Sequence, residues 1–382
     1  MKAPEKNPDS LDINAVKAYH GRKPYREFLA TEGIPIHEEY AVDCKTVEVA
    51  PWPRLGGQGA YVNLAGRSDY LSAYVHEIPP RGETKVEQHI FEKIMNVVSG
   101  SGATVVELPD GRKRTFEWGP GGTFSIPLNA RHQHFNSSSS TPARLLAVTT
   151  MSIVMGMYRS PKFVFENTMN FSERFGDKSL YDGEGEFKKY KPGQHQWETN
   201  FVPDMRALEL PVWHERGVGD SNNITFVWSD NCMHSHISEF ESGTYKKAHM
   251  HHSGAHIVLV SGHGYSLLWK EGEDPVNTVR VDWKPGVLFA PPDGPTFHQH
   301  FNTSSTPARY LCLGPFSSHR WAVLENGPIP KDKADVSIKK GGIQVEYEDE
   351  DPRILDMFEK ECTKSGHPSK MREFLNAAGV KR

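Results

Sequence analysis

Three histidines in the second half of the chain have the residue type and the spacing of a metal site. His249 and His251 are separated by one residue, and His298 follows 47 residues after His251. Side chains two residues apart on a β-strand point to the same face, so the first two imidazoles can reach one point, and His298 can join them from a neighbouring strand of a closed barrel. Three neutral imidazoles suit Fe(II), Mn, Ni, Cu or Zn and leave coordination positions open. The sequence therefore predicts one mononuclear metal site.

The chain is unusually rich in histidine. It contains 19 histidines, and His-x-His occurs four times, beginning at His132, His234, His249 and His298, where roughly one occurrence would be expected by chance. A single histidine is more often a satisfied core residue than a ligand. A triplet with a duplicated partner reverses that preference, because chance does not repeat it.

The sequence is internally duplicated. The motif HQHFN at 132–136, followed by SSSSTPARLL, returns at 298–302 followed by TSSTPARYL, an offset of 166 residues. Trp52 and Trp213 each lie 30 residues before the glycine that opens the histidine-bearing segment of their copy. Each repeat unit therefore spans at least about 100 residues, and the two units should share one fold.

The patterning within each copy favours β-structure. Short segments rich in Val, Ile, Phe and Tyr are interrupted by Gly, Pro and Asp-Gly turns, which is typical of an all-β sandwich or barrel. A helical periodicity appears only over 12–32, 351–364 and 369–378. We expect these helices to lie at the ends of the chain, outside the barrels.

The length of 382 residues favours two domains with appendages. The polar, Gly- and Pro-bearing stretch after the first repeat is typical of an inter-domain connection. The predicted division is a helical N-terminal extension over 1–45, a first barrel over 46–155, a linker over 156–205, a second barrel over 206–325, and a C-terminal extension with helices over 326–382.

These motifs resemble the cupin superfamily. The stretch 243–262, with His249, His251 and His256 between its glycines, is similar to the first cupin motif, and 286–302 is similar to the second. The first repeat follows the same frame in weaker form. The resemblance covers about 50 to 315 and implies a bicupin: an all-β chain of two tandem cupin barrels, of the double-stranded β-helix or jelly-roll type, with N- and C-terminal helical appendages.

The segments HMHHSGAHIVLVSGHGYS and FHQHFN are similar to those of gentisate 1,2-dioxygenase and related ring-cleaving bicupins. That resemblance implies Fe(II) at His249, His251 and His298, and places His300 near the substrate. His300 shares the face of His298, so it is a candidate acid/base or substrate-binding residue. Its repeat twin, His134, leaves a partly structural role for the HQHFN motif open.

His256 departs from the family pattern. Cupin motifs often have a glutamate ligand at this point, whereas the gentisate-type enzymes usually have an apolar residue. A five-residue step from His251 points His256 to the opposite face unless Ser253-Gly254 forms a turn or bulge. A fourth imidazole ligand and a buried structural histidine both remain open.

The first repeat replaces His-x-His by Glu87-Gln88-His89 and keeps His132. Glu87, His89 and His132 could form a site of two histidines and one carboxylate, an arrangement known for non-haem iron. The favoured alternative is a degenerate site that is retained for packing and dimerisation, because a duplicated domain can keep its fold after its site loses function.

Three further residues are candidates for the substrate pocket. His234 and His236 share one face of a predicted strand and could line the cavity, or could serve in the core or on the surface. Arg309 could bind an anion. Because Arg144 repeats it in the first copy, a role in bracing a strand end is the favoured alternative.

Three functions fit these features. The leading hypothesis is an Fe(II) dioxygenase that cleaves a hydroxylated aromatic carboxylate or a similar chelating substrate, with dioxygen as co-substrate. The second is a bicupin decarboxylase, lyase or isomerase that uses Mn, Ni or Zn as a Lewis acid. The third is a non-catalytic metal- or ligand-binding cupin.

The composition narrows the partners. The net charge of −4 gives no electrostatic reason to expect nucleic acid or a membrane as partner, and no apolar window reaches the length of a membrane span or a leader. We expect a cytoplasmic protein with a small-molecule substrate. The four cysteines are far apart and suggest incidental thiols, and the family resemblance implies a homo-oligomer, dimer or tetramer.

Overall fold

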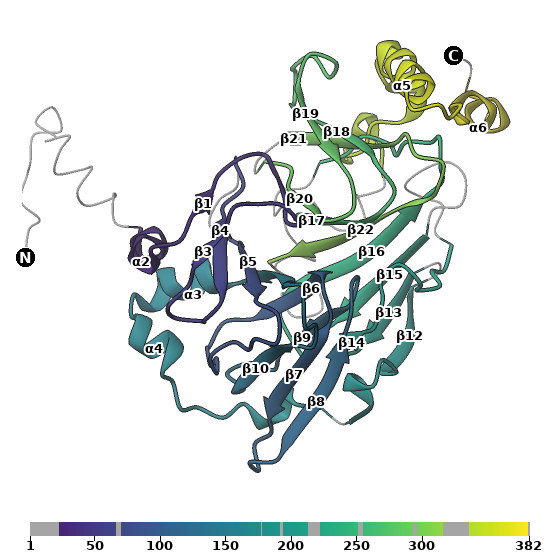
Figure 1. The fold of residues 1–382 in the computed structure, drawn as a ribbon. Coiled ribbons are helices and arrows are strands. Elements are labelled where there is room, and N and C mark those ends of the chain that lie inside the picture. Colours follow the sequence, from purple (N-terminus) through teal and green to yellow (C-terminus); the bar gives the residue numbers. More distant parts are fainter. Residues whose placement is uncertain are drawn as a thin grey trace, which may run out of the picture.

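The computed structural model describes residues 23–65, 70–176, 178–191, 194–212, 222–250, 255–292, 296–315 and 336–380. They form two β-barrels, each made of one large sheet facing a three-stranded sheet (Figure 1). The predicted fold class is confirmed: a mostly β chain of two tandem jelly-roll barrels with small helices at its ends.

The large sheet of the N-terminal barrel runs in the order β1-β4-β5-β11-β6-β9-β14, with β3 beside β4, and faces the small sheet β10-β7-β8. The strands are β1 (Ile36–His37), β3 (Ala50–Pro51), β4 (Gln58–Val62), β5 (Ser72–Ile78), β6 (Lys93–Ser99), β7 (Gly102–Glu107), β8 (Lys113–Trp118), β9 (Thr123–Ser125), β10 (His132–Asn136), β11 (Ala143–Thr149) and β14 (Phe201–Val202). Large apolar side chains, among them Phe124 and Trp118, fill the space between the two sheets.

The C-terminal barrel repeats this plan. Its large sheet runs β12-β13-β15-β16-β22-β17-β20-β2 and faces the small sheet β19-β18-β21. The strands are β2 (Ala41–Asp43), β12 (Glu186–Lys191), β13 (Gln194–Glu198), β15 (Asn222–Val227), β16 (His234–Phe240), β17 (His256–Ser261), β18 (Gly264–Lys270), β19 (Val279–Trp283), β20 (Val287–Phe289), β21 (Thr296–Asn302) and β22 (Ala308–Gly314).

The two barrels are joined through their large sheets. A continuous apolar cluster includes Val148 and Ile94 from the first barrel and Leu313 and Val258 from the second. Strands also cross over: β2, from the N-terminal extension, pairs with β20, and β14, from the connection, pairs with β9. Segments outside each predicted barrel therefore complete its sheets.

The helices lie around the barrels, and the sequence predicted some of them. The two predicted C-terminal helices are confirmed as α5 (Pro352–Lys364) and α6 (Met371–Ala377), and the end of the predicted N-terminal helix as α2 (Pro24–Glu32). The Asp351 side chain accepts a hydrogen bond from the Arg353 amide at the start of α5. Short 3₁₀ turns cover Ser172–Arg174, Lys178–Tyr181, Ile338–Lys340 and Tyr347–Asp349.

Two helices in the connection were not predicted. They are α3 (Met151–Tyr158) and α4 (Pro161–Phe165). The sequence of α3, MSIVMGMY, is apolar on every side and contains β-branched residues, so its periodicity does not distinguish a helix from a strand. The helix forms because Met151 and Met155, one turn apart, pack into the core of the N-terminal barrel.

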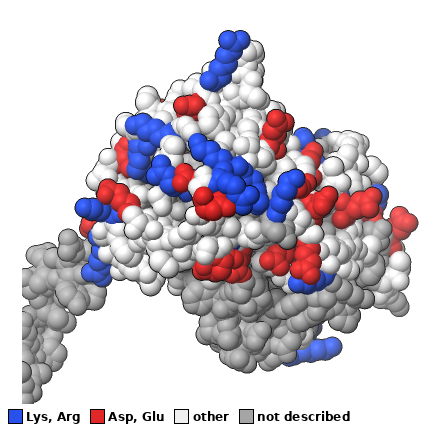
Figure 2. All heavy atoms as spheres, turned by 90° about the horizontal axis from the view of Figure 1, so that it is seen from below, with Lys and Arg blue, Asp and Glu red and all other residues white. Residues whose placement is uncertain are grey.

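None of the helices in the described part of the chain has both the length and the apolar composition that a membrane crossing requires. On the face drawn in Figure 2, lysine and arginine side chains are interspersed with aspartate and glutamate. This mixed charge is consistent with the small net charge of the sequence and gives that face no single-sign field for a polyanion.

Candidate metal centre

Two of the three predicted ligands meet inside the C-terminal barrel. His298 lies on β21, and His249 lies on the segment beside it: each donates its backbone N–H to the carbonyl of the other, at 3.1 and 2.9 Å. Both side chains are buried, and their ring centroids are 4.2 Å apart. The third predicted ligand, His251, lies outside the described residues.

The His249 ring has the orientation of a ligating imidazole. Its Nδ1 lies 3.1 Å from the Lys247 carbonyl oxygen. When Nδ1–H donates to a backbone carbonyl, Nε2 presents its lone pair, which is the tautomer that metal ligands use. The described pair, His249 and His298, is therefore of the donor type that suits a divalent ion.

His300 lies two residues after His298 on β21, as predicted. A relay of two buried hydrogen bonds, from tryptophan to hydroxyl to histidine, fixes its ring. Its ring centroid is 5.4 Å from that of His298. Its Nδ1 lies 2.8 Å from the Ser266 Oγ, which accepts a hydrogen bond from the Trp283 indole at 3.0 Å. The same relay holds His134 through Thr104 and Trp118 in the first barrel. Because both barrels contain this relay, it belongs to the shared fold. It does not by itself assign a chemical role to His300, which would depend on the residues around its ring.

Strand register places His256 on a different face from the barrel interior. Four residues after the repeated arginine, Val148 pairs with Ile94 in one barrel and Leu313 pairs with His256 in the other. His256 is thus equivalent to Ile94, which packs between the barrels, and the preceding Ala255 faces the interior core. A displacement of one residue along a strand reverses the face, so the interior position at this point of the chain belongs to Ala255.

The predicted pocket residues separate into two groups. His234 and His236 contact each other, with Nε2 and Nδ1 2.8 Å apart, and His236 pairs with Cys312 of the interior core. Arg309 instead forms an ion pair with Glu239 and donates to the Met205 and Arg206 carbonyls of the connection.

Arg144 repeats this arrangement with Glu77 at 2.6 Å and with the Cys44 and Val47 carbonyls. The arginine therefore braces a strand in both barrels. In the second barrel its guanidinium is directed to the connection, and the interior position next along β22 belongs to Tyr310.

Lys246 and Tyr310 are interior residues that the sequence did not indicate. Lys246 is 2% exposed, its Nζ is 3.2 Å from the Tyr310 hydroxyl, and it lies 5.0 Å from the centroid of the Tyr310 ring. The Tyr310 ring is 5.2 Å from the His300 ring. Lys246 lies three residues before His249, and that odd step gave no reason to place both on one face.

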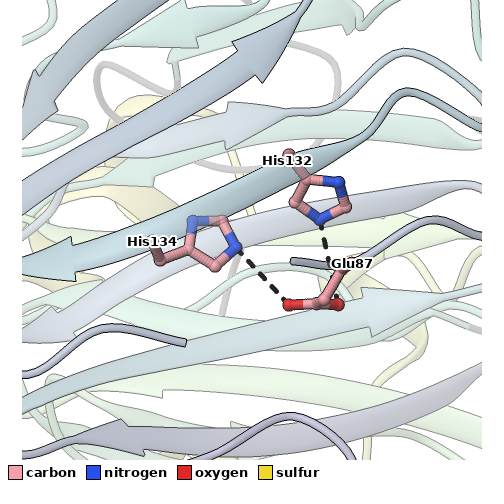
Figure 3. Close-up of side chains that lie close together, drawn as sticks. All are labelled: Glu87, His132 and His134. Atoms are coloured by element: carbon pink, nitrogen blue, oxygen red, sulfur yellow. Dashed lines mark ion pairs between the residues drawn. The ribbon is translucent and has the colours of Figure 1, made fainter. Parts of the chain in front are cut away.

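The first barrel also brings candidate ligands together, in a different set from the predicted one. The ligand atoms of Glu87, His132 and His134 lie within 4.8 Å of one another, and all three residues are buried. Figure 3 shows both imidazoles of β10 directed at the Glu87 carboxylate. The predicted His89 instead stacks on Phe91, with ring centroids 3.7 Å apart.

Lys93 lies among these groups. Its Nζ is 3.0 Å from the Glu87 Oε2 and 2.8 Å from the His132 Nε2, and its side chain is fully buried. An ammonium at hydrogen-bonding distance from two of three donors leaves no room for a metal ion between them. As the cluster stands, it does not fit a metal.

The charges of this cluster are coupled. Burial alone would raise the pKa of Glu87, but the Lys93 ammonium outweighs it and holds that pKa well below its ordinary value. Burial, reinforced by Lys93, lowers the pKa of His132 to about 4. The cluster is therefore an ion pair with neutral imidazoles around it.

No protein-family model and no curated protein matches the chain. Among solved structures it is similar to oxalate decarboxylases. The Lactobacillus farciminis enzyme in its formate complex is 12% identical, with a TM-score of 0.45 over 76% of this chain and 90% of that one. A tryptophan-to-tyrosine variant of the Bacillus subtilis enzyme is 13% identical, with a TM-score of 0.46 over 78% and 86%.

A further Bacillus subtilis structure, used to assign the Mn(II) centres of that enzyme, is 14% identical, with a TM-score of 0.46 over the same shares of the two chains. At such identities and TM-scores, the fold assignment rests on the strand topology of this chain itself.

Proposed function

We propose that this chain is a metal-dependent enzyme whose metal ion lies in the C-terminal barrel and is held by His249, His251 and His298. The observation that carries the proposal is the approach of the His249 and His298 rings, 4.2 Å apart between centroids, on two paired backbone segments. The position of His251 is part of the proposal. An imidazole set of this kind accepts Mn, Fe(II), Ni or Zn, and the supply of metal decides among them.

A small carboxylate that chelates the metal is the proposed substrate class. Lys246 supports it, because a buried ammonium beside the Tyr310 hydroxyl offers a charge-assisted partner for an anion. Lys246 also donates its backbone N–H to the His300 carbonyl at 3.0 Å. The ammonium and the imidazole thus lie on paired segments within one interior.

The proposed reaction is non-oxidative: a decarboxylation, elimination or isomerisation. A bound divalent ion would supply Lewis-acid polarisation of the substrate carboxylate. Reactions of this class deliver or remove a proton at carbon, and Lys246, Tyr310 and His300 all carry protons next to the proposed site. His300 is the proposed acid/base residue, held at its Nδ1 by the Ser266 hydroxyl.

A ring-cleaving Fe(II) dioxygenase is the second candidate. The observation that favours it is the similarity of the segments around His249 and His298 to those of gentisate 1,2-dioxygenases. The two candidates differ in one measurable respect, since only the dioxygenase consumes oxygen during turnover.

The test is a turnover assay of the full chain after removal of bound metal and reloading with Mn(II), Fe(II), Ni(II) or Zn(II). Oxalate, malonate, gentisate and salicylate would be offered with and without air, with products followed by NMR and oxygen by electrode. We expect turnover of one carboxylate without oxygen uptake, abolished by His298→Ala and kept by the exposed control His263→Ala.

Stoichiometric oxygen uptake would replace the proposed reaction by the second candidate. Full activity of the His298→Ala variant, or no turnover of any carboxylate with any of the four metals, would contradict the proposed function itself.

A further inference from the structure

The N-terminal barrel contains a buried cluster in which a lysine takes the central position. Lys93, Glu87, His132 and His134 are each at most 5% exposed. The Lys93 Nζ contacts Glu87 and His132 directly, at 3.0 and 2.8 Å, and His134 lies 3.8 Å from the other carboxylate oxygen. One ammonium thus takes the place among these donors that a coordinated cation would take.

We propose that the N-terminal barrel holds a latent divalent-metal site that the Lys93 ammonium keeps closed. A count of one ion per chain rests in addition on the proposed C-terminal centre, but the closed state of the first barrel does not. It depends on which donors are available to a cation and on what already occupies them.

Beside Lys93, the His132 imidazole has the tautomer that metal-ligating histidines use. The His132 Nδ1 lies 2.9 Å from the Ala130 carbonyl oxygen, so Nδ1–H donates to that oxygen and Nε2 presents its lone pair. His249, on the equivalent bridge of the other barrel, contacts a backbone carbonyl in the same way. In the first barrel, however, this lone pair accepts a hydrogen bond from an ammonium.

Charge also opposes a metal ion there. The Lys93 ammonium already balances the Glu87 carboxylate, as the 3.0 Å contact indicates. A divalent ion placed among the same donors would meet a buried positive charge a few ångströms away, at a cost that a low-dielectric interior magnifies. Lys93 has no exposed surface, so the ammonium has no direct route to water that would relieve the repulsion.

The second barrel lacks the ammonium at the equivalent position. The register that aligns Ile94 with His256 also aligns Lys93 with Ala255. A methyl group therefore stands where the first barrel places an ammonium, while the His249 and His298 rings lie 4.2 Å apart between centroids. In this proposal, the closed first barrel follows from this substitution between the repeats.

The test counts metal in variants of the full chain dialysed against Mn(II) or, separately, Zn(II), with content measured by elemental analysis. Lys93→Ala copies Ala255, and we expect it to hold one more ion per chain than the wild type. In a His298→Ala background, we expect none with Lys93 present and one with Lys93→Ala. This comparison isolates the first barrel, so its result stands even if the proposed C-terminal centre fails.

The matched control is the double variant Glu87→Gln, Lys93→Ala, which lacks both charges and should gain no ion. Because Lys93→Ala leaves the Glu87 carboxylate buried without its partner, we expect its melting temperature to fall without metal and to rise on adding Mn(II) or Zn(II). Lys93→Gln is the second variant and should behave in the same way.

Two results would overturn the proposal. One is a folded Lys93→Ala or Lys93→Gln protein, with native circular dichroism, that gains no metal and no thermal stability from either ion. The other needs no change at Lys93: a His298→Ala protein that keeps a stoichiometric ion and loses it when His132→Ala is added.

Discussion

At the scale of single residues, Lys246 places a buried amino group in the interior of the C-terminal barrel. Its ammonium contacts the Tyr310 hydroxyl and lies over the rings of Phe240 and Tyr310. We expect Lys246→Met to weaken oxalate binding to the metal-loaded protein about tenfold or more, as loss of a charge-assisted partner should, with metal content unchanged. Isothermal titration measures this.

The neighbouring Lys247 provides the control, because it pairs with Glu346, and Lys247→Met should bind as the wild type does. Oxalate binding that is unchanged in Lys246→Met would remove this residue from the site.

His132 links the first barrel to pH. Its pKa is about 4 in the folded protein and 6.5 in the reference state, so between these values the unfolded chain binds a proton that the folded chain does not. Stability from the neutral imidazole is present above pH 6.5 and is lost as pH falls towards 4, by about 3 kcal/mol at most. Protonation of Glu87, whose pKa lies below 4.5, lowers the stability further at still lower pH.

We therefore expect His132→Asn to flatten the decline of the free energy of unfolding between pH 6.5 and 4. Urea titrations at several pH values test this, with the exposed His263→Asn as the control. If the free energy of unfolding of His132→Asn declines over this pH range as steeply as that of the wild type, burial does not lower the pKa of His132.

At the scale of elements, the site depends on a helix distant in sequence. Phe358 of α5 is fully buried and packs on Tyr245 and Phe301, with ring centroids 5.1 and 5.8 Å apart. These two residues immediately precede Lys246 and follow His300. We expect Phe358→Ala to cost about 3–5 kcal/mol of unfolding free energy and to weaken retention of the metal during dialysis.

The half-exposed Phe163 of α4 offers a matched control, and Phe163→Ala should change stability by less than about 0.5 kcal/mol. A Phe358→Ala protein with wild-type stability would show that α5 does not support the site.

The elements also show where sequence reasoning succeeds. Alternation and repetition predicted the barrels, the approach of His249 to His298 and the C-terminal helices, because each depends on local periodicity. His256 illustrates the limit: its five-residue step from His251 left its face undecided, and the pairing with Leu313 decides it. Lys246 and Lys93 were not predicted, because a lysine is expected at the surface and its burial depends on distant partners.

At the scale of the whole molecule, the two barrels are held together by polar contacts as well as by their apolar interface. The Glu92 carboxylate accepts the backbone N–H groups of Cys232 and Met233, at 2.8 and 3.0 Å, and pairs with Arg174 at 2.9 Å. Because these donors bind a charged acceptor, we expect Glu92→Ala to lower the free energy of unfolding by about 2–3 kcal/mol.

Denaturant titration measures that loss, and the exposed Glu83→Ala serves as the control. If Glu92→Ala unfolds at the wild-type midpoint, the barrels are joined by their apolar interface alone.

The two barrels share one framework and differ at a few interior positions. Trp–hydroxyl–histidine relays and arginine braces occur in both, so they serve the fold. At three equivalent positions the first barrel has Glu87, Lys93 and Thr84, where the second has His249, Ala255 and Lys246. The duplication could be read from the sequence, but the equivalence of Lys93 and Ala255 required the three-dimensional register.

The most direct test of this account is the metal content of the purified full chain, measured by elemental analysis beside His298→Ala and His132→Ala. The account predicts one ion per chain in the wild type, near zero in His298→Ala and one in His132→Ala. Retention of the ion by His298→Ala together with its loss from His132→Ala would place the metal in the first barrel and contradict the central claim.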